Sequence, residues 1–198
     1  MYLGRLMCAV ACIGLAAPAI LLAQGTAPPA AAPSGPVAPA DSLTGLLGLL
    51  QMEVVSAAEA MPAEKYDFAP PTTMGDFKGV RTFGSQVKHL AEANYMFFQG
   101  WAVPGATAVD EKTIEALKTK DDIVKALKDS YAYAHAAIAT ITPENAFLAV
   151  QGFPKGTATR VSMASFCAAH SMDHYGQMVE YLRMNGIIPP ASRQQGSM

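Results

Sequence analysis

The chain has 198 residues, of which 51% are hydrophobic and 15% are charged, and its net charge is -2 at neutral pH. A balance this close to neutral, without any cluster of Lys and Arg, argues against a nucleic-acid partner. The length suffices for one domain with a sizeable core once the N-terminal segment is set aside.

Residues 1–23 have the pattern of a secretory signal peptide. Arg5 supplies a positive charge, Leu6–Leu22 form an apolar run of 17 residues without charge, and Ala23 is a small residue at the cleavage position. We therefore expect a secreted or periplasmic protein. The apolar run is just long enough to span a bilayer, so a membrane anchor is the alternative if the segment is not cleaved.

Residues 24–40 consist mainly of Ala, Pro and Gly without any charge, which predicts a disordered linker. If Cys8 and Cys12 leave with the signal peptide, Cys167 is the only remaining cysteine, and no internal disulfide can form. The folded domain is expected over residues 41–192, followed by a short tail at 193–198.

The first helix is expected to begin with Asp41 or Ser42 as its N-cap and to end before Pro62, because apolar residues recur every three or four positions between them. The stripe consists of Leu43, Leu46, Leu47, Leu50, Val54 and Ala58. A long loop follows at 61–79, with three prolines and two glycines. Such a loop is often functional or held in place by its own aromatic side chains.

Three further helices are predicted. One begins at Thr82 and ends at Gly100, the next runs from Thr119 or Lys120 to Pro143, and the last covers about 159–185 with Gly186 as its C-cap. Alternating strand patterns are absent from the sequence. Four amphipathic helices with long connections predict an all-α fold, namely a four-helix bundle with long crossover loops.

The last of these helices carries the most informative feature of the sequence. His170 and His174 are four residues apart, so their imidazoles project from one face of a helix and can bind one metal ion together. The whole chain has only four histidines, which makes this pairing notable.

Three motifs in order resemble the DinB-like (DNA-damage-inducible) superfamily of four-helix bundles. They are Met61-Pro-Ala-Glu-Lys-Tyr-Asp-Phe68 after the first helix, Thr82-Phe-Gly-Ser-Gln-Val-Lys-His89-Leu-Ala-Glu-Ala-Asn-Tyr95 on the second, and His170-Ser-Met-Asp-His174-Tyr-Gly-Gln177 on the fourth. The resemblance implies that His89, His170 and His174 bind a divalent transition metal. Zinc is the first expectation, and nickel, iron, cobalt or copper would also suit three imidazoles.

Three protein ligands leave a coordination position for a small-molecule substrate or water, and on this ground our hypothesis is a metal-dependent hydrolase or transferase. Some family members transfer or use low-molecular-weight thiols, but these are cytosolic, whereas this chain has an export signal. Peptidase chemistry is not expected, because Ser171 stands where His-Glu-x-x-His enzymes have their glutamate. The alternative is a non-catalytic module in which the metal only joins two helices, or in which a homodimer is the functional unit.

Several other residues could have either of two roles. Glu92 and Asp173 could each accept a hydrogen bond from a ligand histidine three residues earlier, or could simply be solvated. His135 is expected to be a boundary histidine of the third helix, and Cys167 a small buried side chain, although either could lie near the metal. The aromatic residues Tyr95, Phe97, Phe98 and Trp101 could wall a substrate cavity, with core packing as their ordinary role.

Overall fold

The structure is a computed structural model and describes residues 35–193. The predicted signal peptide, the predicted linker up to residue 34 and the tail after 193 lie outside the described residues. Within the described part the chain is all helical apart from turns, loops and one isolated bridge between Ala149 and Thr159.

The first long helix, α1 (Pro39–Ala60), begins two residues before the predicted N-cap. Neither Asp41 nor Ser42 caps it, because the capping position is Ala38, which offers no side-chain hydrogen bond, and Pro39 opens the first turn with a φ suited to a helix. Leu47, Leu50 and Val54 are buried as predicted. The prediction for Leu46 is wrong: its side chain is 47% exposed.

The other three long helices begin where the sequence predicted. Threonine side chains cap α2 (Phe83–Phe97), α4 (Lys120–Ile138) and α5 (Arg160–Met184), accepting hydrogen bonds from the backbone N–H three residues later. Their ends agree less well. Helix α2 stops three residues before Gly100, and α4 stops five residues before Pro143, because irregular turns follow both helices.

Four short elements were not expected. They are the 3-10 helices η1 (Ala63–Lys65) and η2 (Thr72–Met74) and the helices α3 (Glu111–Glu115) and α6 (Pro190–Arg193). Asp110 caps α3 by accepting a hydrogen bond from the Lys112 N–H at 2.8 Å. Helix α3 packs against α2.

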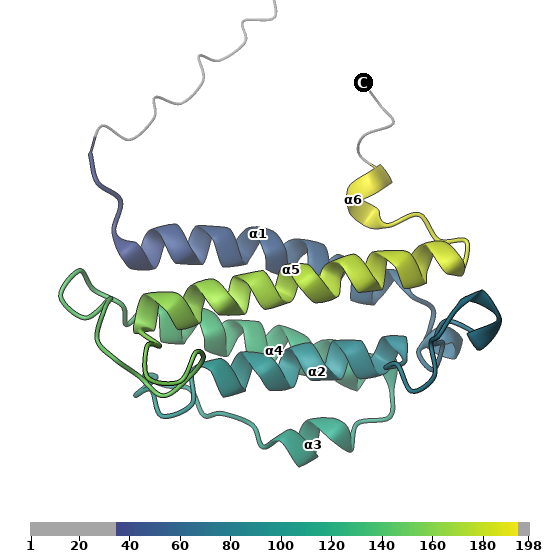
Figure 1. Cartoon of the computed structure of the whole chain (residues 1–198), viewed down its shortest axis with the longest axis horizontal. Coiled ribbons are helices and arrows are strands. Elements are labelled where there is room, and N and C mark those ends of the chain that lie inside the picture. Colours follow the sequence, from purple (N-terminus) through teal and green to yellow (C-terminus); the bar gives the residue numbers. More distant parts are fainter. Residues whose placement is uncertain (1–34, 194–198) are drawn as a thin grey trace, which may run out of the picture. The chain divides into compact units, whose positions relative to one another are not determined.

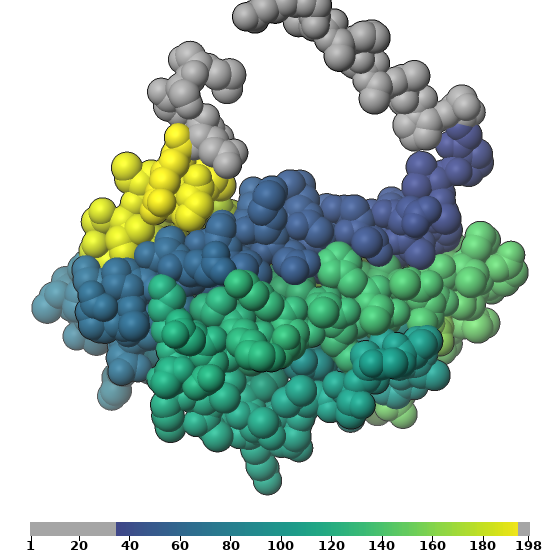
Figure 2. Space-filling view, turned by 180° about the vertical axis from the view of Figure 1, so that it is seen from behind, coloured from purple at the N-terminus to yellow at the C-terminus, as the bar shows by residue number. Residues whose placement is uncertain are grey.

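The four long helices lie side by side (Figure 1), and each packs against two others: α1 against α4 and α5, and α2 against α4 and α5. Figure 2 shows the face on which α1 lies along α4. Helix α1 is also long and apolar enough to cross a membrane by length and composition, although its inner side chains belong to the core. The largest fully buried side chains are Phe83, Phe97, Phe98, Leu47, Met61, Leu90, Ile114, Leu127, Tyr131, Ile138, Met163 and Met178.

Aromatic side chains hold the loop between α1 and α2 against the helices, as the sequence suggested. The Tyr66 hydroxyl donates to the Ala58 carbonyl at 2.8 Å, and the Tyr66 ring packs edge-on against Phe83. Farther along, Phe68 packs against Tyr181 of α5 with ring centroids 5.8 Å apart. The loop is therefore fixed next to the paired helices α2 and α5.

Candidate metal site

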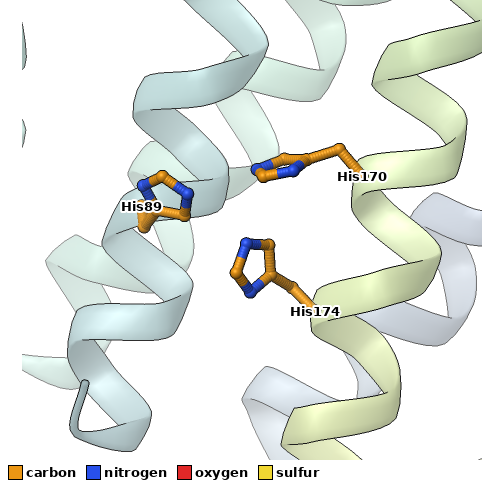
Figure 3. Close-up of side chains that lie close together, drawn as sticks. All are labelled: His89, His170 and His174. Carbon is orange, nitrogen blue, oxygen red and sulfur yellow. The ribbon is translucent and has the colours of Figure 1, made fainter. Parts of the chain in front are cut away.

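Three histidines from two helices meet between α2 and α5. His89 projects from α2, while His170 and His174 project from successive turns of α5, and all three rings point toward one another (Figure 3). Their ring centroids are 4.4 to 5.1 Å apart. One nitrogen of each ring lies within 4.8 Å of the corresponding nitrogen of the other two. The structure thus brings together the three residues that the family resemblance implied.

The helical spacing explains this arrangement. On α5, residues four apart lie one above the other, so His170 and His174 face the same neighbour. That neighbour is α2, which packs against α5 and supplies His89 from its middle. Helical spacing predicts that His170 and His174 lie together, whereas the position of His89 beside them depends on how two helices distant in sequence pack.

The site favours neutral imidazoles. Burial lowers the pKa of His174 to about 4, and the nearby His170 and Arg81 act in the same direction. Burial also lowers the pKa of His89 to about 4, again with Arg81 and the other histidines contributing. The pKa of His170 is lowered chiefly by burial. All three rings therefore have free lone pairs at neutral pH, which is the form that binds metals.

The residues fit a divalent ion. Two buried ring nitrogens, Nε2 of His170 and Nδ1 of His174, have no hydrogen-bond partner, and a buried polar atom without a partner is costly. In tetrahedral zinc sites the Zn–N bond is about 2.0–2.1 Å, which places two ligand nitrogens roughly 3.3 Å apart. The ring nitrogens lie within 4.8 Å of one another, so the rings would have to close by at most about 1.5 Å to bind an ion in this way.

Phenylalanines and an open cavity surround the histidines. Phe97 lies edge-on to His170 with centroids 5.3 Å apart, and Phe166 packs against both of them. A cavity of about 340 Å³ is lined by His89 itself together with Glu92 and Tyr95, among others. Burial raises the pKa of Glu92, and the neighbouring Glu111 and Glu115 raise it further. Of the four aromatic residues considered from the sequence, Phe98 and Trp101 instead pack together in the core.

The two carboxylates proposed as partners of the ligand histidines make no hydrogen bond to them in the described residues. Asp173 instead accepts a hydrogen bond from Gln177 at 3.2 Å. Glu92 faces the cavity beside His89. Sequence spacing had placed both residues near the site without showing what they contact.

Cys167 and His135 have the ordinary roles that the sequence favoured. Cys167 is fully buried, its thiol donates to the Asn94 side-chain oxygen at 3.3 Å, and burial raises its pKa to about 12. His135 on α4 forms a hydrogen bond with Gln51 of α1 at 2.8 Å. Neither residue belongs to the histidine group.

Sequence comparison agrees with the resemblance seen in the motifs. A family model described as the DinB superfamily matches residues 46–178, which include α2, α4, most of α5 and all three histidines. A comparison with curated proteins found no match to this chain. Since the family model covers well over half of the 198 residues, the chain belongs to the DinB superfamily.

Proposed function

We propose that this protein is an exported four-helix bundle that binds a divalent transition metal through His89, His170 and His174 and acts as a metal-dependent hydrolase or transferase on a small molecule. The observation that carries the proposal is the convergence of three ring nitrogens within 4.8 Å of one another. When bound, a divalent ion would supply a Lewis acid that polarises a substrate or makes water more acidic.

The chain supplies further groups suited to such chemistry. The three histidines would occupy three coordination positions of a bound ion, which would leave at least one for a ligand. Glu92 lines the adjacent cavity, and its raised pKa suits a carboxyl group that exchanges a proton closer to neutral pH. Phe97 and Phe166 pack against the ring of His170 and give that side of the site an apolar surface. This combination favours a reactive site over a purely structural one.

Metal analysis tests the ligand set. We expect about one zinc ion per chain after reconstitution and dialysis, and a loss of at least tenfold in affinity for each of the single variants His89→Ala, His170→Ala and His174→Ala. His135→Ala is the matched control, because this histidine lies on α4 and contacts α1. A wild-type chain without stoichiometric metal, or a control that loses metal equally, would refute the proposal.

A second candidate is a non-catalytic, metal-stabilised dimerisation module. The observation that favours it is the outer side of α1, where Leu46, Leu49 and Met52 are 47%, 53% and 63% exposed. Adjacent exposed apolar side chains often mark an interface with another protein.

Cobalt substitution and light scattering separate the two candidates. A reactive site predicts that azide changes the visible spectrum of the cobalt-loaded chain by occupying an open position. A dimerisation module predicts a dimer in solution that Leu49→Glu makes monomeric, together with a cobalt spectrum that does not respond to azide.

A further inference from the structure

A second cavity is lined in part by Gln86 and Gln177, which are three residues from His89 and His174 respectively. Its volume is about 780 Å³, and it is formed by the end of the loop before α2 and by the second half of α5. Apolar side chains make up one wall, namely Phe77, Val80 and Met184. Polar side chains make up the part nearest the histidines, namely Arg81, Gln86 and Gln177.

The glutamines place this cavity one helical turn from the candidate metal site. Gln86 precedes His89 by three residues on α2, and Gln177 follows His174 by three residues on α5. Their side chains bridge the two helices, since Nε2 of Gln86 donates to Oε1 of Gln177 at 2.6 Å. None of the three histidines lines the cavity, so a molecule bound in it would reach the ring nitrogens only by extending about one helical turn past the glutamine pair.

The hydrogen bonds fix the orientation of both amides. Nε2 of Gln177 donates to the carboxylate of Asp173, so Oε1 of Gln177 must be the acceptor from Gln86. This leaves Oε1 of Gln86 without a partner, although the residue is only 3% exposed. A buried carbonyl oxygen without a partner is costly, and because less than 1 Å² of this oxygen is exposed, a ligand N–H or O–H group would remove that cost only after the side chains covering the oxygen move aside.

Arg81 is a positively charged residue that lines the cavity. Its side chain is exposed, and its guanidinium makes no hydrogen bond or ion pair within the described residues. Its charge also contributes to lowering the pKa of all three histidines, which places it near them. Glu180 lines the same cavity and Asp173 is hydrogen-bonded to Gln177 at its edge, so a divalent ion bound to the histidines would have to supply the excess of positive charge.

We propose that this cavity is the subsite for an organic carboxylate that also bears an N–H or O–H group and an apolar portion. Arg81 pairs with the carboxylate, Oε1 of Gln86 accepts the hydrogen bond, and the apolar portion lies against Phe77, Val80 and Met184. The subsite deepens the proposed function, because it assigns the class of small molecule that the metal site would act on.

Binding of simple model compounds tests the subsite. N-acetyl derivatives of valine, leucine and phenylalanine have the required carboxylate, N–H group and apolar side chain, and each is compared with its primary amide. Affinities for the full chain loaded with zinc are measured by ligand-detected NMR. We expect at least one acid to bind about tenfold more tightly than its amide, because a charge-assisted pair with Arg81 is lost in the amide.

Two substitutions that each remove one positive charge test where the carboxylate binds. Arg81→Gln should abolish the preference for the acid over the amide, whereas Arg183→Gln should retain it, because Arg183 bonds to Ser192 outside the cavity. Gln86→Leu should lower the affinity for the acid and for the amide alike, by threefold or more. If no acid is preferred over its amide, or if the preference persists in Arg81→Gln, the subsite is refuted.

The metal content of the same samples keeps this result separate from the proposed function. A chain without stoichiometric zinc that nevertheless prefers acids through Arg81 would refute the metal-dependent function and support the subsite. A zinc-loaded chain whose acid preference does not depend on Arg81 would refute the subsite and leave the metal-dependent function supported.

Discussion

Acidification should destabilise the metal-free protein because its buried histidines must become protonated on unfolding. The perturbation is a fall from pH 7 to pH 5 in the presence of a chelator. The pKa of His174 is about 4 in the folded chain, whereas an unfolded histidine has a pKa of about 6.5. Between these values the unfolded state binds more protons, so stability is complete above about pH 6.5 and falls as the pH decreases toward 4.

The magnitude follows from that difference. For a group with these two pKa values, the free energy of unfolding falls by about 2 kcal/mol between pH 7 and pH 5. His89 has a similar pKa but is more exposed, so screening by solvent reduces its share to about 1 kcal/mol. The two histidines influence one another, which makes about 3 kcal/mol an upper bound for the pair.

Urea unfolding at pH 7, 6 and 5 measures the effect. His174→Gln removes one titrating group, so this variant should lose about 2 kcal/mol less than the wild type over the same range. The comparison of slopes cancels contributions from carboxyl groups elsewhere in the chain. If the wild type and His174→Gln show the same pH dependence, the ring of His174 is not held neutral in the folded state and the reasoning fails.

Three further predictions concern stability and reactivity. Gly84→Ala should destabilise the fold by about 1 kcal/mol or more in urea unfolding, because the added Cβ would lie 3.0 Å from the Tyr66 ring and 3.2 Å from its carbonyl oxygen. Gly45→Ala is the control, because the added methyl meets nothing within 4 Å. This variant should gain up to about 1 kcal/mol of stability. An equal loss of stability in both variants would contradict the close contact at Gly84. Tyr131→Phe should cost about 1 kcal/mol by removing the hydrogen bond to Ser171, and no loss would show that the bond is not formed. Cys167 should resist alkylation at pH 8 in the folded chain and react in urea, as measured by peptide mass spectrometry, since its thiol is buried with a pKa near 12; rapid labelling of the folded chain would contradict its burial.

The helix starts were predictable from local chemistry, but not everywhere. Thr82, Thr119 and Thr159 cap their helices through hydrogen bonds within three residues, so the signal lies in adjacent sequence. The start of α1 was misplaced because Ala38 provides no such bond. The early ends of α2 and α4 could not be read either, since buried residues such as Ile141 continue the apolar pattern after the helix has stopped.

The candidate site was predictable only in part for a related reason. Helical spacing pairs His170 with His174, but no spacing rule connects them with His89 in another helix; the family resemblance supplied that link. The hydrogen bond between Gln86 and Gln177 joins residues 91 positions apart, and no sequence pattern of glutamine predicts such a bond. Arg81 was missed because it lies in the turn before α2 and belongs to no helical stripe.

A network of buried hydrogen bonds next to the histidines has a consequence for metal exchange. Asn94 of α2 accepts from Cys167 of α5 and donates to Ser130 of α4, while Tyr131 of α4 donates to Ser171 of α5. Sliding one helix along another by a single residue, about 1.5 Å, would break these bonds. Because the network contains none of the three histidines, it fixes their relative heights without a metal. An ion bound there could then leave and be replaced by another while the helices stay in place, and supply and ligand chemistry would decide which metal occupies the site.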